Sequence, residues 1–123
     1  MWIFTPTSFL SIVDKGGDGT TLLVRARRRG EIEAVFPDAT VETTPRNDYL
    51  YRARIDRERV AQVVAETLRN LHHANYKAAI KDPDLHDACM EVWEVMYRYQ
   101  NRHREDRVQA EPSRKRRNPG TVI

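Results

Sequence analysis

Four arginines occur in two short stretches of similar sequence, and they are the residues of this chain best suited to bind a charged partner. Val24-Arg25-Ala26-Arg27 is matched later in the chain by Tyr51-Arg52-Ala53-Arg54. Both stretches alternate arginine with less polar residues, as a strand with two unlike faces does. If the two strands are neighbours, the guanidinium groups share one sheet face, where they would bind phosphate or an acidic protein bidentately. The residues of this predicted face are Arg25, Arg27, Arg52 and Arg54.

A structural role for these arginines competes with the binding role. Charged residues on an exposed sheet face commonly pair with opposite charges on neighbouring strands. Glu42, Asp14 and Asp48 lie in or beside predicted strands and would supply those partners. The sequence predicts no aromatic residue on that face, whereas platforms for single-stranded nucleic acid stack bases on aromatic side chains. Solvated, ion-paired arginines are therefore favoured over a nucleic-acid surface.

The positive charge of the chain is concentrated near its end. Residues 101–123 hold seven of the 21 basic and three of the 18 acidic residues, which leaves 14 and 15 in residues 1–100. The body is therefore close to neutral and offers no sustained positive field to a polyanion. Two roles remain open for the basic tail: weak, non-specific contact with nucleic acid, or solubility alone. The possible contacts are Arg114, Lys115, Arg116 and Arg117.

Three histidines and the single cysteine raise the question of a metal site. His86 and Cys89 are three residues apart on a predicted helix, and His72-His73 precedes that helix. Their spacing matches no zinc-binding pattern, and Cys89 falls on an apolar stripe, where a thiol behaves as a small hydrophobic group. A core-facing thiol also lacks the electropositive surroundings that activate a nucleophile. We therefore predict no metal ligand, no catalytic residue and no cofactor.

Large aromatic residues are the remaining candidates for a binding surface. Trp2, Phe4, Trp93 and Tyr97 have side chains that anchor protein interfaces. In a domain of this size such residues more often belong to the core. A core position is the prediction here.

The stretch Tyr49–Leu71 predicts one strand that runs directly into one amphipathic helix. Tyr49–Ile55 alternates in polarity, and Asp56 stands where the side chain of a helix N-cap residue belongs. The helix that follows has an apolar stripe at helical spacing, which predicts a buried face. We expect that face to pack on the sheet together with Val92 and Met96. The stripe consists of Val60, Val63, Val64, Leu68 and Leu71.

The repeated arginine stretches predict a twice-used strand–strand–helix unit, because each stretch leads into a helix. The expected fold is α+β: a four-stranded antiparallel sheet of ferredoxin-like type, with helices on one face and an extra C-terminal helix from Asp82-Pro83. Residues 1–103 are predicted as a single domain and residues 104–123 as a basic, disordered tail. The expected strands are Trp2–Asp14, interrupted at Thr5–Ser8, then Leu22–Arg27, Thr40–Thr44 and Tyr49–Ile55.

The composition of the chain indicates the cellular compartment of the protein. No run of apolar residues approaches the roughly 20 that a membrane-spanning helix requires. A single cysteine permits no internal disulfide, which is typical of a reducing compartment. The chain is thus predicted to be cytoplasmic and not to associate with a membrane.

Several stretches together resemble a family of small uncharacterised proteins from actinobacteria and their phages. The resemblance rests on the opening WIFTPTSFLSIV, the LLVRAR and YLYRARI strands, and the later ANYKAAI and EVWEVMY. It covers about residues 1–100, and His72-His73 departs from the pattern, which has more apolar or acidic residues there. This family has no assigned activity, so the resemblance implies an origin and no site residue.

The function predicted from the sequence is a non-enzymatic protein-interaction or accessory domain, whose partner is another protein or a second copy of itself. The alternative is a nucleic-acid-associated protein that uses the strand arginines and the basic tail. A hydrolase would need converging carboxylates, and Asp14 and Glu42 are the only carboxylates on predicted strands.

Overall fold

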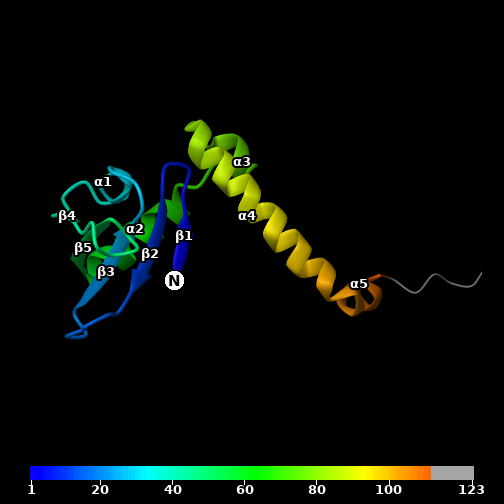
Figure 1. The fold of residues 1–123 in the computed structure, drawn as a ribbon, viewed down its shortest axis with the longest axis horizontal. Coiled ribbons are helices and arrows are strands. Elements are labelled where there is room, and N and C mark those ends of the chain that lie inside the picture. Colours follow the sequence, from blue (N-terminus) through cyan, green and yellow to red (C-terminus); the bar gives the residue numbers. More distant parts are fainter. Residues whose placement is uncertain (112–123) are drawn as a thin grey trace, which may run out of the picture. The chain divides into compact units, whose positions relative to one another are not determined.

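The computed structural model describes residues 1–111, which belong to two compact units, Met1–Cys89 and a second that starts at Met90 (Figure 1). The fold is α+β, as the sequence predicts. None of the helices in residues 1–111 is long and apolar enough to span a bilayer. The possible tail contacts Arg114, Lys115, Arg116 and Arg117 lie outside the described residues.

The first unit is built on one antiparallel sheet of five strands in the order β1-β2-β3-β5-β4 (Figure 1). Neighbouring strands run antiparallel throughout. Two strand–strand–helix units, β2-β3-α1 and β4-β5-α2, follow one another along the chain. The strands are β1 (Trp2–Phe4), β2 (Phe9–Val13), β3 (Thr21–Ala26), β4 (Glu42–Thr43) and β5 (Tyr51–Asp56).

The sheet has five strands rather than the expected four, because the chain reverses at Thr5–Ser8 instead of continuing as one interrupted strand. The Thr5 N–H donates to the Ser8 carbonyl at 2.8 Å, and the Thr5 hydroxyl accepts from the Ser8 N–H at 3.0 Å. These bonds close a tight turn around Pro6, a residue that cannot donate to a ladder. The ferredoxin-like arrangement is therefore not confirmed.

Two helices of the first unit pack on the same side of the sheet. Helix α1 (Glu31–Val35) contacts β2, β3 and β5, and helix α2 (Arg57–Arg69) contacts β3 and β5. Asp56 is at the N-cap of α2, but its side chain makes no capping hydrogen bond, contrary to the expectation. The core between sheet and helices consists of Leu10, Ile12, Val24, Ala26, Ile32, Phe36, Ala53, Ile55, Val60 and Val63.

The apolar stripe of α2 is only partly buried. Val60 and Val63 are in the core, as predicted, whereas Leu68 is 64% exposed and Leu71, just beyond the helix, is 52% exposed. The buried residues come from the first two turns of α2, which lie against the sheet. The expected packing of Leu68 in the core is therefore wrong.

Three further helices, and no strand, follow α2 within the described residues. They are α3 (Tyr76–Ala79), α4 (Pro83–Arg102) and α5 (Arg104–Ala110). Asp82 precedes α4, and its carboxylate accepts the Asp84 N–H at 2.9 Å, as the Asp-Pro signal predicts. Arg104–Ala110, expected as part of a disordered tail, is helical. The rest of that expected tail, residues 112–123, lies outside the described residues.

The loop between β2 and β3 is held by side chains at both of its ends. Gly16 and Gly19 adopt positive φ angles of 69° and 82°, which glycine accepts without strain. The Asp18 carboxylate accepts the backbone N–H groups of Thr20 and Thr21, and these bonds lower the pKa of Asp18 to about 2. The glycine-rich stretch is therefore a tight connection between two strands.

Candidate functional site

The four strand arginines do come together, because β3 and β5 are neighbours. Arg25 pairs directly with Arg52 across the two strands, and Leu23 pairs with Arg54. These residues lie on the sheet face opposite the core, since the flanking pair Val24 and Ala53 is buried. Placing two guanidinium groups directly opposite each other is unfavourable unless neighbouring groups compensate.

Tyr49 supplies part of that compensation. Its ring, which is 4% exposed, lies beneath the guanidinium groups of Arg25 and Arg27, at 4.5 and 4.1 Å from the ring centroid. Such cation–π contacts are attractive and strengthen with burial. Arg25 also donates to the Ser11 hydroxyl at 2.8 Å, and Arg27 to the Asp48 carbonyl at 3.2 Å. Tyr49 thus packs against the arginines. The alternation of Tyr49–Ile55 predicts Tyr49 on the core face of the sheet, and this prediction is wrong.

The other two arginines are also held by the protein itself. Arg52 forms an ion pair with Asp48 at 3.5 Å, and Arg54 donates to the carbonyl of Lys15 at 2.9 Å. Asp48 is one of the partners that the sequence suggested, whereas Asp14 pairs instead with Arg57 at 3.1 Å. All four guanidinium groups thus make intramolecular contacts. This arrangement supports the structural role that the sequence favoured.

The face that carries the arginines also carries aromatic residues, which the sequence did not predict. Trp2 pairs with Ser11, and Ser11 pairs with Arg25, so the three residues form one row across the sheet. Phe9 contacts Trp2 edge-on at 5.7 Å and stacks on Phe4 at 4.7 Å between ring centroids. Trp2 is 69% exposed and is therefore not a core residue, contrary to the expectation.

The histidines and Cys89 do not form a metal site. Among the described residues, no three His, Cys, Asp or Glu side chains are placed to hold a metal ion. Cys89 is buried, and its thiol lies 3.5 Å from the hydroxyl of Tyr76. Burial and the neighbouring Cys89 raise the pKa of Tyr76, so its hydroxyl keeps its proton and donates to the Thr5 carbonyl at 2.9 Å. This bond ties α3 to the turn after β1.

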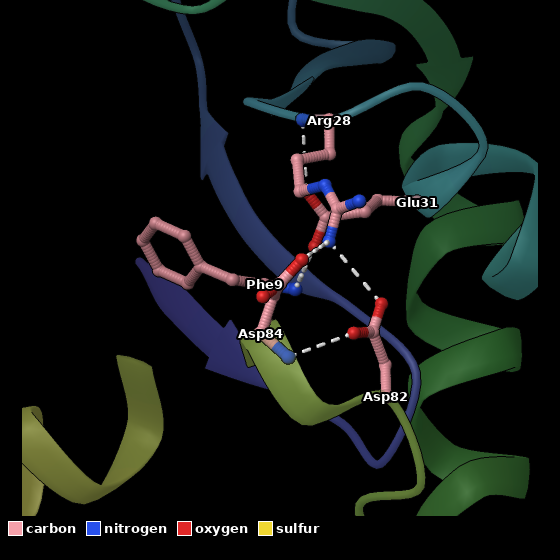
Figure 2. Close-up of polar contacts among 5 residues, drawn as sticks. All are labelled: Phe9, Arg28, Glu31, Asp82 and Asp84. Carbon is pink, nitrogen blue, oxygen red and sulfur yellow. Dashed lines mark hydrogen bonds and ion pairs between the residues drawn. The ribbon is translucent and has the colours of Figure 1, made fainter. Parts of the chain in front are cut away.

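A polar cluster connects α1 to the start of β2 and to the start of α4 (Figure 2). The carboxylate of Glu31, a buried residue, accepts the N–H of Phe9 at 2.7 Å and the N–H of Arg28 at 3.0 Å. The side chain of Arg28 pairs with Asp82 at 3.2 Å and with Asp84 at 3.8 Å. Every charged group in the cluster has a protein partner, so its role is structural.

An apolar groove of about 510 Å³ opens on the core side of β1 and β2, beside α2. This feature, called the apolar groove below, exists because α2 packs on β3 and β5, farther along the sheet. Its walls are almost entirely aliphatic or aromatic, and the only titratable side chains that line it are His72, His73 and Tyr76. The apolar lining residues are Ile3, Phe4, Pro6, Leu10, Ile12, Val35, Phe36, Val64, Leu68 and Leu71.

The second unit presents apolar side chains along one side of α4. Val92, Val95, Met96 and Tyr99, called the α4 face below, fall within about 100° of the helix circumference at 3.6 residues per turn. Each is between 40% and 55% exposed. Val92 and Met96, which the sequence placed in the core, are therefore surface residues. Trp93 and Tyr97 stack at 5.3 Å along the same helix, at 49% and 46% exposure rather than in the core.

Comparison with protein-family models, curated proteins and solved structures finds no match to this chain. The α4 face and the apolar groove are therefore the features of the molecule that bear on function. Sequence reasoning identified Val92 and Met96 of the α4 face but assigned them to the core. It missed the groove, because Leu68 and Leu71 appear in the sequence only as part of an apolar helix stripe, and their exposure is known from the structure alone.

Proposed function

We propose that this protein is a non-enzymatic interaction domain that self-associates through the α4 face. The observation that carries the proposal is the exposure of four large apolar side chains on one side of a helix. A contiguous apolar patch of this kind typically marks an interaction site. Val92, Met96 and Tyr99 follow a four–three spacing, which is the spacing of the seam between two supercoiled helices.

The charges beside the α4 face favour a second copy as the partner. From Met90 to Arg102 the acidic residues, Glu91 and Glu94, precede the basic residues, Arg98 and Arg102. Two such helices placed antiparallel bring each acidic half beside the basic half of the other copy, whereas a parallel pair aligns like charges. An antiparallel pair also satisfies two-fold symmetry, in which one patch pairs with itself. The helix contact is short, so we expect dissociation constants of roughly micromolar order.

Replacing Met96 by glutamate should abolish self-association without unfolding the protein. Met96 is 55% exposed, so the fold does not depend on its burial, but a charge at the centre of the seam has no partner. Asn101→Glu, which adds the same charge to an exposed position off the face, is the matched control. Sedimentation velocity over a concentration series should show a dimer for wild type and the control, and a monomer for Met96→Glu.

A charge exchange tests the antiparallel orientation in the same assay. Glu91→Arg and Arg98→Glu should each weaken the dimer, and the double variant should restore it because both halves change sign together. A wild-type chain that stays monomeric at millimolar concentration would contradict self-association. If the double variant does not restore the dimer, the antiparallel orientation is contradicted, but self-association is not.

A second candidate function, binding of single-stranded nucleic acid, is favoured by Trp2 and Phe9 on the arginine face. Bases stack on aromatic side chains, and guanidinium groups contact phosphate. We nevertheless expect only weak binding to an oligonucleotide, lost at physiological salt, because Arg25 and Arg52 already make internal contacts. Tight, salt-resistant binding that Trp2→Ala weakens would favour this function over self-association.

A further inference from the structure

The apolar groove of the Met1–Cys89 unit has the size of a small-molecule pocket. Its volume of about 510 Å³ falls within the roughly 300–1,000 Å³ typical of such sites. It extends from the surface, at Leu68 and Leu71, down to Leu10 and Phe36, which are each 1% exposed. An occupant of the groove would therefore lie mainly against aliphatic and aromatic carbon on its protein side.

The polar lining groups are concentrated in one part of the groove. Apart from Thr5, all of them come from the segment Thr67–Tyr76. The Tyr76 hydroxyl donates to the Thr5 carbonyl, and the ring of His73 lies 5.9 Å from the Tyr76 ring, so these residues are neighbours. A ligand with a long apolar body and one polar end matches this distribution.

The polar residues that line the groove indicate which charge the polar end of the ligand carries. His72 Nδ1 lies 3.0 Å from the Asn70 carbonyl, which only accepts, so Nδ1 carries a proton. In the neutral ring Nε2 is then an acceptor, and only in the imidazolium form is it a second donor. Within residues 1–111 no carboxylate, lysine or arginine lines the groove, so no acidic side chain there repels an anion or attracts a cation. Imidazolium and carboxylate form charge-assisted hydrogen bonds.

We infer that the apolar groove binds an aliphatic carboxylate, with the chain along Leu10, Phe36 and Leu68 and the carboxylate beside His72 and His73. The site is separate from the α4 face and does not depend on self-association. Binding would cover the exposed Leu68 and Leu71, and the removal of their apolar surface from water is the main gain in free energy available there.

A chain-length series with the full-length protein tests the apolar part of the site. Octanoate, decanoate and dodecanoate should bind with affinity rising about fifteenfold for each added pair of methylenes, until the groove is filled. Isothermal titration calorimetry measures the three dissociation constants. A flat series, or no heat for any member, would overturn the inference.

Two comparisons test the placement of the ligand. Leu68→Gln with Leu71→Gln should weaken decanoate binding about tenfold or more, because both exposed side chains line the groove. Ala61→Gln, an exposed change on α2 away from the groove, should leave it unchanged. Both side chains replaced are at the surface, so the fold should persist, and circular dichroism checks this.

The second comparison concerns the charged end. Decanol should bind at least about tenfold more weakly than decanoate, and His72→Gln with His73→Gln should remove that difference. Equal binding of decanol and decanoate by the wild-type protein would overturn the carboxylate assignment. If decanoate fails to bind and the two leucine changes instead weaken self-association, the groove belongs to a protein contact and the inference is wrong.

Discussion

Val63→Asp should unfold the Met1–Cys89 unit. Val63 is 8% exposed and belongs to the cluster in which α2 meets the sheet. An unpaired carboxylate there costs several kcal/mol, comparable with the roughly 5–15 kcal/mol that stabilise a typical domain. Loss of the cooperative thermal transition, followed by circular dichroism, is the expected result.

The control for this variant is on the adjacent position of the same helix. Gln62 is exposed, so Gln62→Asp places the same side chain inside the same helix without burying it. Both variants therefore contain the same Asp helix propensity. Its melting temperature should stay within a few degrees of wild type. A Val63→Asp protein that melts like Gln62→Asp would contradict the packing of α2 on the sheet.

Val63 also shows how far sequence periodicity predicts this fold. The stripe from Val60 to Leu71 identified the helix and its buried face, because a 3.6-residue repeat reports which side is apolar. It could not say where along the helix burial ends. The sheet sets that limit, because β3 and β5 are the strands that α2 contacts. The buried residues of α2 lie in its first turns, and Leu68, farther along the helix, stays in solvent.

The sheet face that carries the arginines was predicted only in part, again because periodicity does not report which elements lie next to one another. The repeat of Arg25 and Arg52 correctly suggested neighbouring strands, and the structure pairs the two residues directly. Trp2 joins them because the chain reverses at Thr5–Ser8 and pairs β1 with β2. A one-strand interpretation of Trp2–Asp14 cannot place Trp2 on the row of Arg25, so the aromatic residues of this face were missed.

The apolar groove depends on which strands the helices leave uncovered, and no local pattern encodes that. Ile3, Leu10 and Ile12 alternate as residues of any half-buried strand do. Leu68 gives the same helical signal whether it packs in a core or borders a groove. The residues of the site were therefore predictable as apolar, but their arrangement around an open volume was not.

Glu31→Gln should destabilise the first unit although it removes no atom of the side-chain skeleton. Both carboxylate oxygens of Glu31 accept backbone N–H groups, from Phe9 at 2.7 Å and from Arg28 at 3.0 Å (Figure 2). Glutamine has one accepting oxygen, so its amide nitrogen would face one of these donors. A part-buried N–H then loses its partner, at a cost of about 1.5–3 kcal/mol because the lost bond was to a charged group.

The cost should appear in the junction between α1 and β2, since these are the elements that Glu31 joins. Helix α1 starts after Gly30 without a side-chain cap, and Phe9 is the first residue of β2. Urea denaturation measures the free energy of unfolding, and Glu33→Gln is the matched control, because Glu33 is exposed on the same helix. The control should change the stability by less than about 0.5 kcal/mol. Equal stability of the two variants would show that the Glu31 carboxylate bonds contribute nothing, and that α1 is held by the packing of Ile32 and Phe36 and by the bond from the Ser8 hydroxyl to the Glu31 carbonyl.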